Sequence, residues 1–345
     1  MPEITRRELL ASGIAFSASP LLERSLWARE IGSISGELPS SRADGVIAVA
    51  PREQLLFDFG WKFKFGHGTD PSKDLNFGYG QADFSKTGEF KFAKADFNDS
   101  DWIPVRLPHD WAVALRVVHD DSGTGDSQLR SHGYKPLGRR YPETSVGWYR
   151  CEFEIAANDS GRRIWVEFDG AFRDVLVFVN GCFVGRSDNG YVPFRFDLTD
   201  FLAYGAKNYI VMRVDASFGD GWFYEGAGVY RHVWLLKTDP VYLGRWESVV
   251  RSTVDDGIAT LDLSTTVENK KHTTQKAKVK WQIFDARGNV VARAETLERP
   301  VDPDKSENFH AVAKVPHPDL WSVNTPNLYS ALVTVESEGK VSDGE

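Results

Sequence analysis

Large apolar and polar residues alternate with a period of two along most of the chain after residue 51. This alternation is typical of strands that place one face on a core and the other toward water. Helical periodicity is nearly absent, apart from one turn near Thr199. In the first part of the chain, the pattern predicts strands over residues 55–66, 147–155, 162–169, 174–184, 191–198, 208–216 and 229–237.

The clearest local element is a hairpin around Asn180-Gly181. Val175, Val177 and Val179 alternate with two further apolar residues before the turn, so the strand is apolar on both faces. Asn and Gly are the residues that most easily adopt the positive φ angles of a type I′ turn. The strand after the turn is also apolar on both faces, so we predict a tight hairpin inside a two-sheet sandwich, with both of its faces covered.

A domain boundary is predicted at Asp239-Pro240, because this dipeptide interrupts a strand pattern and the aromatic density falls after it. Beyond it, short alternating segments separated by turn residues favour an immunoglobulin-like β-sandwich. These segments cover residues 245–253, 258–269, 277–295, 307–315 and 327–337. The predicted fold class is all-β, with one sandwich over residues 51–238 and a second over residues 239–345.

The first residues differ from the rest of the chain. Arg6 and Arg7 precede a short, mildly apolar stretch rich in small residues, which resembles a twin-arginine export signal over residues 1–29. An ordinary N-terminal helix with a basic start is the alternative. Residues 30–50 mix Ser, Gly and Pro without periodicity and are predicted to be a linker. An export signal predicts a periplasmic or secreted protein, and no later stretch has the 18 consecutive apolar residues of a membrane span.

Composition narrows the range of functions. The net charge is −8 and the basic residues are scattered, which argues against nucleic acid as a partner. Only Cys151 and Cys182 are present, so a disulfide framework is not expected, and whether the two pair stays open. No metal-ligand spacing, phosphate loop or nucleophile elbow occurs, so neither a metal nor a cofactor is predicted.

Two aromatic loops are the candidate sites. A sugar presents C–H faces edged with hydroxyls, so its site combines flat rings with hydrogen-bonding side chains. The segments at residues 107–113 and 219–232 offer that mixture, and the alternative for each is a packed corner of the sandwich. The candidate substrate-binding residues are His109, Asp110, Trp111, Asp220, Trp222, Tyr224, Glu225 and Arg231.

Four motifs occur in one order: "LPHDW", "GYKPLGRRYPETSVGWYRCEFEI", "VFVNGCFVGRSDNGYVPFRFDLTDFL" and "GWFYEGAGVYRHVWL". Together they resemble the N-terminal sugar-binding domain of family 2 glycoside hydrolases, which include β-galactosidases, β-glucuronidases and β-mannosidases. The later "HPDLWSVNTPNLYSALVTV" resembles the end of that family's immunoglobulin-like domain. The resemblance implies a jelly-roll, galactose-binding-like sandwich followed by an immunoglobulin-like sandwich.

The resemblance further implies that complete members of the family also carry a TIM barrel with two catalytic glutamates. One of these glutamates follows an asparagine in an Asn-Glu pair. This chain contains no Asn-Glu dipeptide. We therefore hypothesise that the chain is the non-catalytic portion of a β-galactosidase-like enzyme. In that enzyme it would contact a β-galactoside-like carbohydrate, next to a C-terminal barrel that lies outside this chain. The alternatives are a stand-alone carbohydrate-binding sandwich protein and an adhesion-type structural module.

Overall fold

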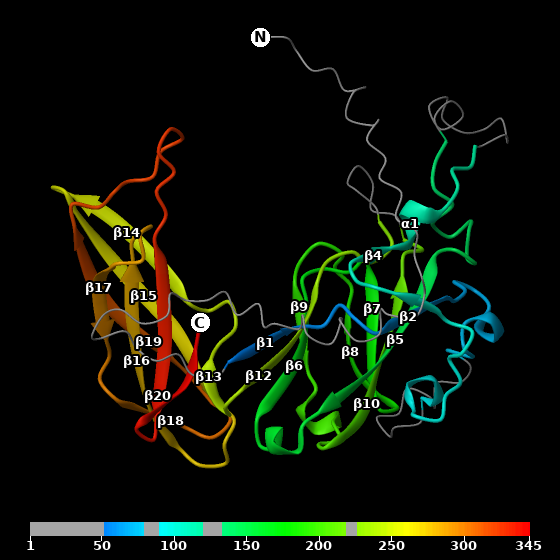
Figure 1. The fold of residues 1–345 in the computed structure, drawn as a ribbon, viewed down its shortest axis with the longest axis horizontal. Coiled ribbons are helices and arrows are strands. Elements are labelled where there is room, and N and C mark those ends of the chain that lie inside the picture. The colour runs from blue at the N-terminus through cyan, green and yellow to red at the C-terminus, as the bar shows by residue number, and fades with distance from the viewer. Residues whose placement is uncertain (1–51, 79–89, 120–132, 219–225) are drawn as a thin grey trace, which may run out of the picture. The chain divides into compact units, whose positions relative to one another are not determined.

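The structure is a computed structural model, and it describes residues 52–78, 90–119, 133–218 and 226–345. These residues form two β-sandwiches, coloured from blue to green and from yellow to red in Figure 1. The all-β prediction is confirmed, because the described helices are single turns. None of the described helices is long and apolar enough to span a membrane. They are η2 (Pro71–Lys73), η4 (Lys91–Ala93), α1 (Trp111–Ala114), η5 (Ala157–Asp159) and η6 (Thr199–Phe201).

The first sandwich is the expected jelly roll, with antiparallel strands in two main sheets. One sheet has the order β1 (Glu53–Leu56), β12 (Val233–Thr238), β6 (Arg163–Phe168) and β9 (Phe194–Asp197). The other has the order β3 (Ile103–Val105), β2 (Trp61–Phe65), β5 (Val146–Ile155), β10 (Ala206–Asp215), β7 (Asp174–Val179) and β8 (Cys182–Ser187). A two-stranded ribbon joins β11 (Gly228–Val229) to β4 (His109–Asp110).

The six-stranded sheet has an apolar cluster on each face. Tyr149 and Met212 belong to the main core between the sheets, together with Phe168 of the opposite sheet. Trp148 and Phe178 belong to a second cluster with the segment at residues 90–102. Both faces of β5 are therefore buried, which explains why its sequence is apolar at consecutive positions.

The prediction of one strand over residues 55–66 was wrong. The segment forms β1 in one sheet and β2 in the other, because the chain turns between them at Gly60, whose φ is +79°. The buried carboxylate of Asp58 accepts the backbone N–H of Val233 at 3.0 Å and holds this turn against β12. Alternation continues through the turn, so periodicity alone did not reveal the change of sheet.

The hairpin prediction is confirmed. β7 and β8 pair across Asn180 and Gly181, whose φ angles are +50° and +87°. β8 is nevertheless the last strand of its sheet and is only half-buried, so the prediction that both of its faces are covered was wrong. The predicted strand at residues 191–198 is also shorter, since β9 covers only four residues.

The second sandwich also consists of two antiparallel sheets. One contains β13 (Val241–Leu243), β14 (Val249–Asp255), β15 (Ile258–Asn269) and β19 (Lys305–Pro316). The other contains β16 (Gln275–Phe284), β17 (Val290–Glu295), β18 (Arg299–Val301), β20 (Ser330–Ser337) and β21 (Lys340–Gly344). Trp281 and Phe309 fill the core between them. The predicted strand over residues 277–295 is a hairpin, because Asp285 accepts the backbone N–H groups of Arg287 and Asn289 in a turn.

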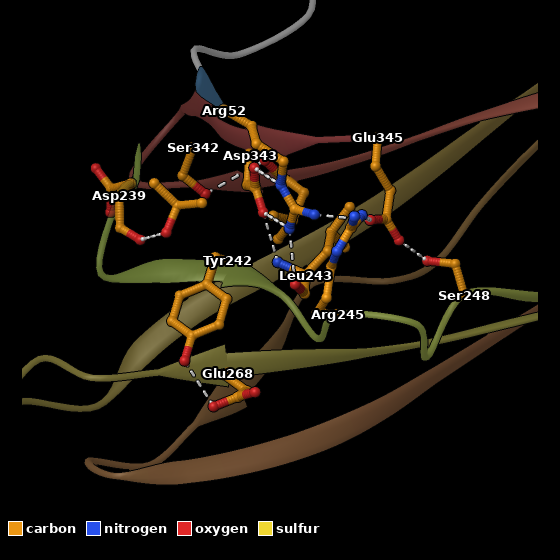
Figure 2. A network of polar contacts seen from close by, with 12 residues as sticks. Arg52, Asp239, Tyr242, Leu243, Arg245, Ser248, Glu268, Ser342, Asp343 and Glu345 are labelled. Carbon is orange, nitrogen blue, oxygen red and sulfur yellow. Dashed lines mark hydrogen bonds and ion pairs between the residues drawn. The ribbon is translucent and has the colours of Figure 1, made fainter. Parts of the chain in front are cut away.

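A buried polar network connects the segment before β1 with β13 and β21 (Figure 2). The guanidinium of Arg52 donates to both carboxylate oxygens of Asp343 and to the carbonyl of Leu243. Its remaining amino group donates to Glu345, which also accepts the hydroxyl of Ser248. Arg52 therefore uses all three of its nitrogens to join strands that are distant in sequence.

The two cysteines lie in one row across the six-stranded sheet. Cys151 faces Ile210, Ile210 faces Val179, and Val179 faces Cys182. With strands spaced about 4.8 Å apart, three steps separate the two cysteines by roughly 14 Å. A disulfide needs Cα atoms within about 7 Å, so both cysteines are free.

Candidate functional site

The ribbon of β4 and β11 brings the two predicted aromatic loops side by side. His109 faces Val229 and Asp110 faces Gly228 in its register, and Trp111 donates its backbone N–H to the carbonyl of Ala227. The two segments are more than 100 residues apart in sequence. The candidate residues of the first loop therefore share one locus with the segment that follows residue 225.

Asp110 holds this locus together. Its Oδ1 accepts the backbone N–H of Ala112 at 2.9 Å and that of Ala227 at 3.0 Å. The first bond caps the short helix α1, and the second fixes the chain that leads into β11. A carboxylate that accepts two backbone N–H groups is a positioning group.

His109 is held in place by two aromatic neighbours. Its half-buried ring packs edge-on against Phe63, and its Nδ1 lies 2.8 Å from the hydroxyl of Tyr149. Burial lowers the pKa of His109, and the nearby carboxylate of Asp110 opposes this shift. Because Nδ1 is engaged by Tyr149, Nε2 is the ring nitrogen that could form a hydrogen bond with a sugar hydroxyl.

Trp111 lies in the core, and this contradicts the prediction that it contacts a ligand. Only 2% of the residue is exposed, and its ring packs against Phe63 and Tyr149. Its indole N–H donates to the carbonyl of Thr144 at 2.8 Å. Since its faces are covered and its donor is used, Trp111 takes the packed-corner role that the sequence analysis held as the alternative.

Arg231 is exposed, and its guanidinium lies 5.4 Å from the ring of Tyr230. It lies two residues after β11, the strand that pairs with the His109 loop. The other four candidates, Asp220, Trp222, Tyr224 and Glu225, lie outside the described residues.

Two residues, one that contacts His109 and one that follows β11 in the sequence, were not among the predicted candidates. Tyr149 is fully buried on β5 and orients His109, and burial raises its pKa well above 10. His232 places its Nδ1 2.6 Å from Asp58, which comes from the turn after β1. No signal in the sequence pairs these residues, because each contact joins segments that are distant along the chain.

Among the residues that the structure describes, no three His, Cys, Asp or Glu side chains are close enough to share a metal ion.

Two sequence profiles match the chain in the order of its sandwiches. The profile described as "Glycosyl hydrolases family 2, sugar binding domain" matches residues 88–239, and the one described as "Glycosyl hydrolases family 2" matches residues 247–345. The chain belongs to glycosyl hydrolase family 2. The resemblance drawn from the sequence motifs is confirmed.

Individual proteins of the family are similar to most of this chain, but the match covers only part of their own length. The chain is 33% identical over 290 residues to the β-galactosidase BoGH2A of Bacteroides ovatus, a match that covers 83% of this chain and 30% of that protein. It is 24% identical over 282 residues to a β-glucuronidase of Formosa agariphila, covering 75% of this chain and 28% of that protein. The crystal structure of a family 2 member from Bacteroides cellulosilyticus superimposes with a TM-score of 0.66 at 28% identity, covering 85% of this chain and 35% of the other. The chain therefore spans about a third of the length of these relatives.

Proposed function

We propose that this chain is a non-catalytic, carbohydrate-contacting portion of a β-galactosidase-like glycoside hydrolase. The observation that carries the proposal is the match to the Bacteroides ovatus β-galactosidase, which covers most of this chain but 30% of that protein. Hydrolysis of a glycosidic bond needs two carboxyl groups that face one cleft. In this proposal, both belong to the part of the enzyme that corresponds to the remaining length of the relatives.

The role proposed for the jelly roll is to border the sugar site. His109 supplies a neutral hydrogen-bonding ring held by Tyr149, and Asp110 holds the loop that carries it. Arg231 adds an exposed donor on the adjoining segment. A rim of this kind affects how tightly substrate binds and leaves bond cleavage to other groups.

An exposed apolar surface on the second sandwich also supports the proposal that this chain is part of a larger enzyme. Leu320, Trp321 and Tyr329 are 57%, 61% and 37% exposed, and they line a cavity of about 270 Å³ with residues of β14. Exposed apolar clusters of this kind mark surfaces that another domain or protein covers. The proposed occupant is the barrel that follows the immunoglobulin-like domain in complete family members.

Activity of the purified 345-residue chain tests the proposal. We expect no release of nitrophenol from nitrophenyl β-galactoside or β-glucuronide. Measurable turnover by pure material would overturn the non-catalytic assignment. A reading frame that stops at residue 345, with galactoside binding by the chain alone, would instead favour the stand-alone carbohydrate-binding protein.

The rim role is tested in an enzyme that contains both sandwiches and the barrel. His109→Ala is expected to raise KM for the galactoside by about tenfold with little change in kcat, since one hydrogen bond to the bound sugar is lost. His310→Ala is the matched control, because His310 is an exposed histidine of the second sandwich paired with Asp262. An unchanged KM in His109→Ala with normal thermal stability would remove the rim role.

We also propose that the protein is exported through its N-terminal arginine pair. Arg6 and Arg7 precede a short apolar segment of small residues, the composition of a twin-arginine signal. The protein is then expected in the periplasm with a shortened N-terminus, and Arg6→Lys with Arg7→Lys is expected to retain it in the cytoplasm. Mass spectrometry of the N-terminus in each fraction checks this, and an intact Met1 in the periplasm would contradict cleavage.

A further inference from the structure

One row of side chains crosses the four-stranded sheet of the jelly roll on a single face. Trp234 of β12 faces Glu167 of β6, and Glu167 faces Arg195 of β9. Residues directly opposite in antiparallel strands point to the same side of a sheet. Arg195 therefore lies on the same face as an aromatic ring and a carboxylate.

The carboxylate in this row is already neutralised. Glu167 is 1% exposed and accepts two hydrogen bonds from the guanidinium of Arg245, at 2.9 and 2.7 Å. Asp197, two residues along the same strand as Arg195, is paired with Arg163. Both neighbouring acids are thus committed to other arginines.

The side chain of Arg195 forms no ion pair or hydrogen bond within the part of the chain that the structure describes. Its guanidinium carbon lies 5.2 Å from the ring centre of Trp165 and 6.0 Å from that of Trp246. The residue is half-buried. A half-buried guanidinium between rings, with its five N–H donors unused, is arranged to receive a planar anion.

Trp246 supplies the accessible ring, because Trp165 is 5% exposed whereas Trp246 is 53% exposed. The backbone of Trp246 has a φ of +61°. This left-handed conformation is rare and strained for a bulky residue. The fold thus holds a large ring outward beside Arg195 at an energetic cost, a combination that is concentrated at functional positions.

We propose that Arg195 and Trp246 bind an acidic saccharide of the hexuronate class. The carboxylate of the sugar accepts the paired N–H groups of Arg195, and the C–H face of its ring stacks on Trp246. A neutral sugar would leave the guanidinium without an anion and would bind more weakly. This inference depends only on the described surface and shares no residue with the proposed rim around His109.

Calorimetric titration of the full 345-residue chain with digalacturonate tests the proposal, with galactobiose as the neutral counterpart. Digalacturonate is expected to bind at least about tenfold more tightly than galactobiose and to quench tryptophan fluorescence. Arg195→Gln and Trp246→Phe are expected to weaken digalacturonate binding by about tenfold and several-fold, respectively, with melting temperatures near that of the wild type.

Arg299→Gln is the matched control, because Arg299 also carries a guanidinium over an aromatic ring, 4.7 Å from Phe309. Its affinity for digalacturonate is expected to equal that of the wild type. Equal binding by Arg195→Gln, no preference for the acidic sugar, or equally tight binding of sulfate would each overturn the proposal. Loss of binding in Arg299→Gln as well would show a nonspecific charge effect and overturn it too.

Discussion

Asp343 accepts two hydrogen bonds from the guanidinium of Arg52, at 3.0 and 2.5 Å, and a third from the backbone N–H of Leu243 at 2.8 Å. The Asp343 side chain is fully buried, and that of Arg52 is 8% exposed. Burial alone would lower the pKa of Arg52, but the carboxylates of Asp343 and Glu345 hold it above its ordinary value. The carboxylates of Asp343 and Glu345 therefore keep the buried guanidinium of Arg52 charged.

Replacing Arg52 with methionine is expected to destabilise the fold by about 3–5 kcal/mol, because it leaves the buried charge of Asp343 without its cation. Urea unfolding followed by tryptophan fluorescence measures the change. Arg52→Met combined with Asp343→Asn is expected to cost less than the sum of the two single changes, because neither charge is then left alone.

The matched control for that experiment is Lys276→Met. Lys276 and Glu298 form an exposed pair at 3.8 Å, so the loss is expected to stay within about 0.5 kcal/mol. Equal effects of Lys276→Met and Arg52→Met would contradict the importance given to the buried network.

The lowered pKa of His109 predicts a loss of stability in mild acid. The unfolded chain takes up a proton near the ordinary value of 6.5, whereas the folded ring, desolvated by burial, takes it up only at lower pH. Between these two values the unfolded state binds more protons, so the free energy of unfolding falls as the pH is lowered below 6.5. Thermal melting between pH 7.5 and 5 is expected to be less steep in His109→Gln, and an identical pH dependence would contradict the assignment.

The two cysteines are expected to differ in reactivity. Burial raises the pKa of the Cys151 thiol to about 12, whereas Cys182 is half-buried on an edge strand. Since the thiolate is the reactive form, iodoacetamide is expected to modify Cys182 long before Cys151 in the folded protein. Mass spectrometry of the alkylated peptides checks the order. A Cys151–Cys182 disulfide in the unreduced protein would contradict the strand register.

The turn residue Asn180 is expected to contribute both its backbone angle and its side chain. Its Nδ2 donates to the carbonyl of Phe201 and to Oδ1 of Asn208, and its Oδ1 accepts the N–H of Tyr209. Asn180→Gly keeps the positive φ and loses these bonds, at about 1–3 kcal/mol. Asn180→Ala is expected to cost about 1 kcal/mol more, because Cβ disfavours the left-handed conformation.

Denaturant melts of the two variants separate these contributions. Asn189→Ala is the control, because Asn189 makes an exposed hydrogen bond in the loop after β8. Its change is expected to stay within about 0.5 kcal/mol. If Asn180→Ala and Asn180→Gly were equally stable, the turn would not need the positive φ.

Local chemistry made several features predictable. The strand over residues 258–269 follows from alternation, because a residue that points to a core must be apolar whatever the strand's partner is. The turn at Asn180-Gly181 follows from the backbone angles that these two residues tolerate. The ordered motifs also led to the correct family.

Features that depend on distant partners were not predictable. Nothing near residue 111 in the sequence indicates that Phe63 and Tyr149 cover the Trp111 ring, so a buried tryptophan was taken for a ligand contact. Residues 55–66 keep their alternation while the chain passes from one sheet to the other, because Phe57 of the turn packs on the same core as Trp61 and Phe63 of β2. The same holds for the neighbours of Arg195, which come from β6 and from the segment around Trp246.

By itself, the sequence determined the fold class, the main hairpin and the family, since each depends on residue types within a short window. Only the tertiary structure decided which polar groups are paired and which are free. Asp110, Asp58 and Glu167 are all acids in the sequence, but each accepts from a donor that is distant along the chain. Arg195 is left available because the acids beside it already have other partners, and that outcome depends on strand register, which no local pattern encodes.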